Sequence, residues 1–100
     1  MSRKPIIAGN WKMNLLQAQA KEVFEGVKNF VKDYNAPQLP TVVIAPVFTS
    51  LAAVEAVKCD CGCGDNKISI ACQNCHWEKS GAYTGEISVE MAKDAGCDYV

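Results

Sequence analysis

The chain has 100 residues, of which 49% are hydrophobic and 21% charged, and its formal net charge is -1. This length holds one small globular domain. The near-neutral charge excludes the strongly basic surfaces that bind nucleic acid or anionic membranes. The longest apolar runs are too short for a membrane-spanning helix or a secretory signal peptide, so we expect a cytoplasmic protein.

The cysteine content is high, with 6 cysteines in so short a chain. In a secreted protein this count would indicate a disulfide scaffold. The N-terminus carries no signal peptide, and the apolar content is sufficient for a core without disulfides. We therefore expect these residues to be free thiols or metal ligands.

The first predicted elements are a strand and a long amphipathic helix. Residues 5–9 form a short apolar run closed by Gly9, which is typical of a buried strand. Further on, apolar residues recur at steps of three and four, which predicts one hydrophobic stripe along a helix. The stripe consists of Leu16, Ala20, Val23, Phe24, Val27, Phe30, Val31 and Tyr34. Asn35, Pro37 and Pro40 should end this helix.

A second strand and helix follow. Residues 41–45 are a β-branched apolar run that stops at Pro46, which predicts a second buried strand. Thr49 or Ser50 is expected to cap a helix that continues through Val57.

The last part of the chain repeats the pattern. Residues 67–72 predict a third strand, and Ser88 is expected to cap a short third helix that stops at Gly96. Residues 98–100 are expected to begin a fourth strand.

The resulting order, β-α-β-α-β-α-β, predicts an α/β fold with a parallel sheet and right-handed crossovers. Successive strands start about 31 residues apart, which agrees with roughly 250 residues shared by eight βα units. We expect residues 1–100 to form one partial domain without an internal boundary. Because the sequence stops inside an apolar strand, it reads as cut from a longer protein.

Asn10 and Lys12 are the candidate binding residues. They follow the first predicted strand, and ligand sites of parallel α/β folds lie at the carboxyl ends of the strands. Because side chains on a strand alternate, we expect both residues to point the same way and to bind an anionic or carbonyl group. A surface lysine beside a turn-forming asparagine is the alternative.

Four segments together resemble one known family. Residues 9–14 (GNWKMN) and 45–51 (APVFTSL) resemble the first two strand exits of triosephosphate isomerases. Gln73-Asn74 with residues 81–88 (GAYTGEIS) resembles the third loop of that family, and residues 95–100 resemble the entry to its fourth strand. The matches occur in family order and span the chain.

The resemblance implies the N-terminal part of a (β/α)8 TIM barrel, about three βα units plus the start of strand 4. It implies interconversion of dihydroxyacetone phosphate and D-glyceraldehyde 3-phosphate through an enediolate, in glycolysis and gluconeogenesis, without a cofactor or metal. Asn10 and Lys12 match the family's substrate-binding residues, and Lys12 would stabilise the enediolate charge. The family's catalytic histidine and glutamate would lie beyond Val100, so the 100-residue chain alone should be inactive.

The resemblance also implies a homodimer. The family's third loop, matched by residues 73–85, inserts into the neighbouring subunit. Tyr83, Thr84 and Gly85 would then form the inserted tip, and Met13 would receive the partner's loop. The interface would be two-fold and isologous.

The cysteines suggest a different possibility. Cys59, Cys61 and Cys63 alternate in one loop and, with Cys97, could form a soft-metal site at the amino end of the sheet. The length of the third strand places Cys75 at the opposite end. Unliganded thiols sensitive to oxidation are the simpler interpretation.

Two further residues receive structural interpretations. Cys72 lies on a predicted buried strand and is expected in the core. His76, the single histidine, does not match the family's catalytic position and is expected to be a solvated loop residue.

Two other classes of protein remain as alternatives to the enzyme. One is a free-standing α/β module that binds an anion at Lys12. The other is a thiol-rich module that binds a metal or a partner chain. In either case, a partial barrel made of residues 1–100 is open and should expose a strand edge and apolar surface.

Overall fold

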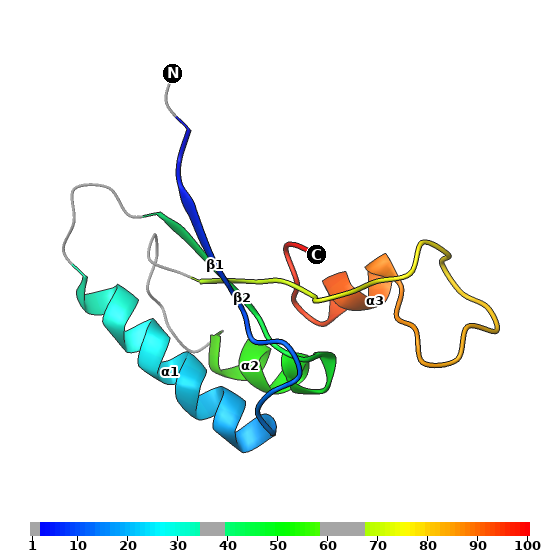
Figure 1. Ribbon diagram of the computed structural model, residues 1–100, viewed down its shortest axis with the longest axis horizontal. Helices are drawn as coiled ribbons and strands as arrows, with labels where there is room; N and C mark the ends of the chain where they lie inside the picture. Colours follow the sequence, from blue (N-terminus) through cyan, green and yellow to red (C-terminus); the bar gives the residue numbers. More distant parts are fainter. Residues whose placement is uncertain (1–2, 35–39, 59–67) are drawn as a thin grey trace.

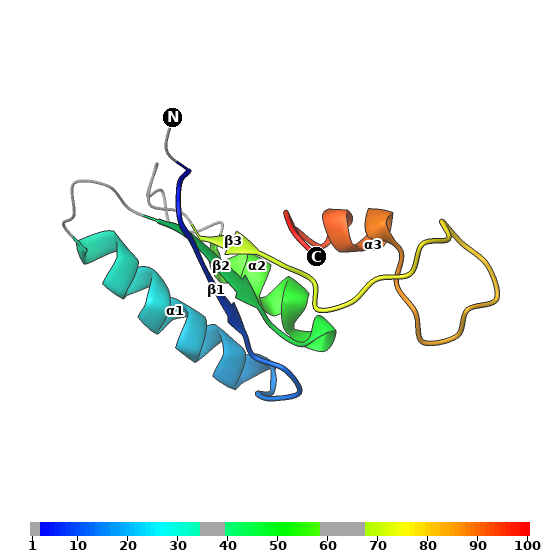
Figure 2. The ribbon, with the colours of Figure 1, turned by 45° about the horizontal axis from the view of Figure 1, so that its top comes forward.

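The computed structural model describes residues 3–34, 40–58 and 68–100. It contains three parallel strands in the order β1-β2-β3. The strands are β1 (Ile6–Asn10), β2 (Thr41–Ala45) and β3 (Ser69–Ile70). The helices are α1 (Gln17–Asp33), a 3-10 turn η1 (Phe48–Ser50), α2 (Leu51–Lys58) and α3 (Val89–Asp94). Figures 1 and 2 show this alternation of strands and helices.

The sheet register confirms the predicted parallel arrangement. Ile6 of β1 pairs with Thr41 of β2, and Val43 of β2 pairs with Ser69 of β3. Beyond β3, Ala71 forms a parallel bridge with Tyr99, which places the expected fourth strand next to the third. The third strand is shorter than predicted, since only Ser69–Ile70 of residues 67–72 are paired as a strand, and Lys67 lies outside the described residues.

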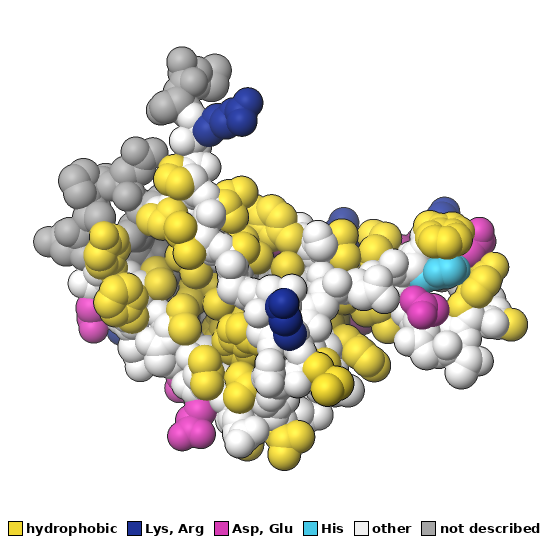
Figure 3. Space-filling model, in the orientation of Figure 1, with side chains coloured by type: hydrophobic (Ala, Val, Ile, Leu, Met, Phe, Trp, Pro, Cys, Tyr) yellow, Lys and Arg dark blue, Asp and Glu magenta, His cyan; other side chains and the backbone are white. Residues whose placement is uncertain are grey.

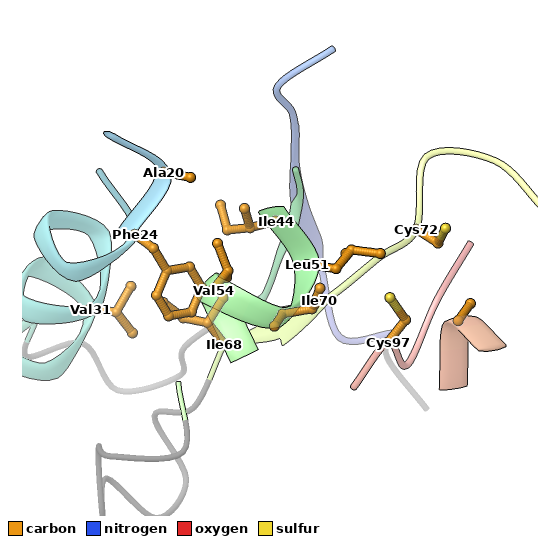
Figure 4. Packing of buried hydrophobic residues seen from close by; sticks show 11 residues of the cluster. Ala20, Phe24, Val31, Ile44, Leu51, Val54, Ile68, Ile70, Cys72 and Cys97 are labelled. Carbon is orange, nitrogen blue, oxygen red and sulfur yellow. The ribbon is translucent and has the colours of Figure 1, made fainter. Parts of the chain in front are cut away.

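The core lies between the sheet and the helices. Figure 4 shows Phe24 of α1 and Val54 of α2 packed near Ile68, which precedes β3. All three side chains are at most 2% exposed. Ile44, Ile70, Cys72 and Cys97 extend this cluster towards α3. The burial of Cys72 confirms its predicted place in the core.

The hydrophobic stripe of α1 is only partly buried. Ala20, Phe24 and Val31 enter the core, but Leu16 and Phe30 are 77% and 68% exposed. The ring of Phe30 stacks on that of Tyr34 on the outside of the helix, with centroids 5.7 Å apart. The helical period was predicted correctly, but the stripe is wider than the surface that α2 and the sheet cover.

The prediction of a buried first strand was wrong. Ile6 and Ile7 of β1 are 56% and 60% exposed. Among the described residues β1 pairs only with β2, so one edge and much of its surface face solvent. This exposure is the one expected of an open partial barrel. Figure 3 shows hydrophobic side chains spread over the face of the molecule that carries β1.

The helix ends show one wrong and one correct prediction. Thr49 and Ser50 belong to η1, which runs directly into α2, and the buried Ser50 hydroxyl finds no hydrogen-bond partner among the described residues. It therefore does not cap α2. Ser88 does cap α3, because its Oγ accepts a hydrogen bond from the Met91 amide over 3.1 Å. Gly96, with φ 101°, follows that helix as predicted.

Candidate functional site

Asn10 is the last residue of β1, and Lys12 lies in the turn that follows it. Lys12 has a left-handed backbone with φ 56°. The alternation of side chains along a strand, on which their common direction was predicted, therefore does not extend to Lys12. The Asn10 Oδ1 atom instead accepts a hydrogen bond from the Lys12 amide over 2.9 Å, which makes Asn10 the start of a tight turn.

A left-handed backbone is costly for a lysine, by about 1–3 kcal/mol, and persists only where its surroundings enforce it. Leu15 in the same loop has φ 75°. The Asn14 side chain donates to the carbonyl oxygen of Trp11 over 2.7 Å, and the Trp11 amide donates to Ala45 O over 3.0 Å. These bonds fix the backbone on both sides of Lys12.

Gln73 supplies the remaining support from the carboxyl end of β3. Its Nε2 atom donates to Lys12 O over 2.9 Å and to Ala45 O over 2.8 Å. One side-chain amide thus links the loops after β1, β2 and β3. From the sequence, Gln73 is one of the residues that carry the resemblance, and no role is predicted for it. Its place directly after a predicted strand was the signal that could have identified it.

The Lys12 ammonium forms no ion pair with any carboxylate that the structure describes. In the described parts of the chain, the ion pairs are those of Lys58 with Asp98, at 3.5 Å, and with Glu55, at 3.9 Å. Lys12 is exposed at the carboxyl edge of the sheet. An anionic group arriving at this edge would therefore meet a positive charge that none of the described carboxylates neutralises.

The residues expected at a dimer interface lie on two separate segments. Met13, in the loop after β1, is 90% exposed, and Tyr83 is 46% exposed. Tyr83 lies on the 73–85 loop, which extends away from the sheet beyond α3 in both ribbon views (Figures 1 and 2). A turn closes the tip, since the Glu86 amide donates to Tyr83 O over 3.0 Å. Thr84 and Gly85 lie inside this turn and are exposed.

His76 is a partly exposed loop residue, so the expectation of a solvated loop histidine holds only in part. Its ring lies 4.5 Å from that of Trp77 and 4.3 Å from that of Tyr83, measured between centroids. Its Nε2 atom is buried and has no hydrogen-bond partner among the described residues. The difference arises because two aromatic rings of the same loop pack against the imidazole.

The described cysteines do not form a metal centre. Cys59, Cys61 and Cys63 lie outside the described residues. Within residues 3–34, 40–58 and 68–100, no group of three or more His, Cys, Asp or Glu side chains is placed to bind a metal ion. Cys97 instead neighbours Cys72, and burial together with that thiol raises the pKa of Cys97 to about 11.

No helix in the described part of the chain is long and apolar enough to cross a membrane.

The fold and the site together define a class of protein. Successive parallel βα units in the order β1-β2-β3, with an exposed lysine at the carboxyl end of the first strand, are the arrangement of a βα-barrel protein, in which ligand sites lie at that edge.

Comparisons with known proteins identify the family. Residues 5–100 match the family model described as "Triosephosphate isomerase". The chain is 43% identical over 97 residues to the triosephosphate isomerase of Synechococcus sp. (strain CC9902), and that alignment covers 97% of the chain. It is 45% identical over 98 residues, or 98% of the chain, to that of Syntrophotalea carbinolica. The chain belongs to the triosephosphate isomerase family.

The comparisons also show how much of a relative this chain represents. It covers 37% of the Synechococcus protein and 36% of the Syntrophotalea protein. The triosephosphate isomerase of Streptococcus equi subsp. zooepidemicus is 43% identical over 100 residues, which is 100% of this chain and 36% of that relative.

Proposed function

We propose that this chain supplies the first three βα units, and the start of the fourth strand, of a triosephosphate isomerase. The complete enzyme would interconvert dihydroxyacetone phosphate and D-glyceraldehyde 3-phosphate through an enediolate, in glycolysis and gluconeogenesis. The observation that carries this proposal is the place of Lys12, a cation on a strained backbone at the carboxyl edge of the sheet, which pairs with none of the carboxylates in the described ranges. Membership of the family supports it.

Lys12 would act on charge that develops during the reaction. Removal of a proton beside the carbonyl group places negative charge on the carbonyl oxygen, and the same substrate carries a phosphate dianion. A cation already fixed in position stabilises such charge without reorganising, and does so most strongly once substrate and protein exclude water. The strained backbone supports this role because folding alone fixes the point from which the Lys12 side chain leaves the sheet edge.

Asn10 would complement the lysine as a neutral donor. Its Oδ1 atom accepts from the Lys12 amide, which orients the side-chain amide, and its Nδ2 group, which donates to none of the described residues, would donate to a substrate oxygen. A donor and a cation two residues apart at one strand end can bind two oxygens of one small phosphorylated carbonyl compound. Asn10 and Lys12 would therefore orient the substrate as well as bind it.

The remaining catalytic groups would come from beyond Val100. The resemblance implies a carboxylate base and a neutral histidine, and this family is itself a standard example of that pairing. His76 would not serve as this histidine, because its ring packs against Trp77 and Tyr83 on the projecting loop, away from Lys12 (Figure 1). We therefore propose that residues 1–100 form a partial barrel domain that is inactive alone.

The same proposal extends to assembly and location. Met13 and the tip of the 73–85 loop would form a two-fold homodimer interface, in which each loop inserts beside the partner's first loop. The protein would act in the cytoplasm on a small-molecule substrate, without a cofactor, a metal, a nucleic acid or a membrane.

The test is the isomerase activity of the complete protein as its source makes it. Lys12→Ala should lower kcat/KM at least about 100-fold, the effect typical of losing one fixed electrostatic group. Lys21→Ala is the matched control, since Lys21 is an exposed lysine on α1. It should leave the rate unchanged.

Three results would count against the proposal. Equal rates for the Lys12→Ala and Lys21→Ala enzymes would remove Lys12 from the mechanism. Isomerase activity of the 1–100 polypeptide alone would contradict the need for residues beyond Val100. An inactive complete protein that still binds triose phosphate in a Lys12-dependent manner would favour the anion-binding module instead.

A further inference from the structure

The Tyr83 side chain packs against its own loop. Its ring lies 4.3 Å from the ring of His76, between centroids. On the Gly81 side the contact is so close that a Cβ atom added to Gly81 would lie 2.7 Å from Tyr83 Cε2. Gly81 also has φ 140°, a conformation that side chains rarely adopt. The ring of Tyr83 therefore packs against the ring of His76 and the backbone of Gly81.

His76 connects the packed Tyr83 ring to the base of the loop. Its amide donates to Ile87 O over 2.7 Å, and His76 forms a parallel bridge with Ser88, the residue that caps α3. The backbone of His76 is thus anchored where the loop returns to the fold, while its ring contacts Tyr83 near the tip. One residue joins the fixed base of the loop to its projecting end.

This connection matters because the loop projects from the fold. Both ribbon views show the loop extending past α3, away from the sheet and from α1 (Figures 1 and 2). The Trp77 ring, which also stacks on His76, is 83% exposed. Contacts between rings of the loop therefore contribute to its shape. A projecting loop with a preset shape loses less conformational entropy when it binds.

We propose that His76 is a positioning residue for dimerisation, whose ring holds Tyr83 and so presets the tip of the 73–85 loop for a second copy of this chain. The inference rests on the homodimer in the proposed function and adds the residue that tunes it. The His76 ring acts here as an aromatic surface; proton transfer plays no part.

The test is the dimer dissociation constant of the complete protein, measured by sedimentation over a dilution series. His76→Ala removes the ring and should weaken the dimer about tenfold, the scale of one lost aromatic pair. His76→Phe keeps an aromatic ring without the imidazole nitrogens and should stay within about twofold of the original protein. Lys21→Ala is the control, an exposed substitution on α1, outside both segments of the proposed interface, that should have no effect.

The rescue by phenylalanine separates positioning from general damage to the fold. A His76→Ala protein that dimerises as tightly as the original would overturn the inference. So would a His76→Phe protein as weak as His76→Ala, because the aromatic surface would then not be the cause. If the original protein is an active monomer at every concentration, the homodimer and this inference both fail, while the proposed isomerase activity stands.

Discussion

The side-chain amide of Gln73 donates to the carbonyl oxygen of Lys12 over 2.9 Å, across a sequence separation of 61 residues. The same nitrogen donates to Ala45 O over 2.8 Å. The strained backbone of Lys12 is therefore tied to the ends of two other strands. The candidate site is a property of the whole sheet edge, because no single loop contains all of its supports.

Replacing Gln73 should show the value of this link. Gln73→Met keeps a similar volume but removes both hydrogen bonds, and should lower the free energy of unfolding of the complete protein by about 2 kcal/mol. Gln17→Met is the matched control, because Gln17 donates one hydrogen bond, to Thr49 O over 3.1 Å. Its cost should be about 1 kcal/mol. Urea unfolding measures both, and equal costs would show that the second bond contributes nothing.

Two glycines should respond to alanine in opposite directions. Gly96 has φ 101°, and a Cβ atom there would collide with the Glu55 carboxylate. Gly96→Ala should therefore lower the free energy of unfolding by about 2 kcal/mol or more. Gly26 lies inside α1 with nothing within 4 Å of its Cβ position. Gly26→Ala should raise stability by about 0.5–1 kcal/mol, because alanine favours helices. Thermal unfolding measures both changes. If the unfolding temperatures of the two variants shifted in the same direction, this interpretation would be contradicted.

The Ser88 cap should contribute about 1 kcal/mol to the free energy of unfolding. Ser88→Ala removes the acceptor for the Met91 amide and leaves that donor unpaired at the start of α3. Ser80→Ala, in the exposed part of the 73–85 loop, is the control and should cost nothing measurable. Both free energies can be read from denaturant unfolding. A Ser88→Ala protein as stable as the control would mean that the hydrogen bond seen at the cap does not stabilise the helix.

Stability should fall at alkaline pH because of Cys97. Burial, followed by the neighbouring Cys72, raises the pKa of Cys97 from 9.0 to about 11. Above pH 9 the unfolded chain releases a proton that the folded chain retains until about pH 11. The folded state then binds more protons, so stability declines with rising pH across this window, by about 1 kcal/mol per unit.

Cys97→Ala should flatten that decline between pH 9 and 11. The measurement is the free energy of unfolding at several pH values, with the Cys97→Ala protein compared against the original. An identical slope in both proteins would assign the pH dependence to other groups.

The sequence by itself determined the order and type of the elements and the capping of α3. Alternating apolar runs and helical periods predicted parallel strands, and residues 41–45 were placed correctly to the residue. The Ser88 cap and the stop at Gly96 were also predicted, because each depends on a backbone preference within one helical turn.

The tertiary structure alone decided which of these segments meet and what they cover. The exposure of Ile6 and Ile7 depends on what packs against β1, which no local pattern records. Three contacts join residues that the sequence separates: His76 with Tyr83, Cys97 with Cys72, and Gln73 with Lys12. Local propensities act over a few residues, whereas these contacts exist only after the strands are aligned. The chemistry of the candidate site follows from that alignment.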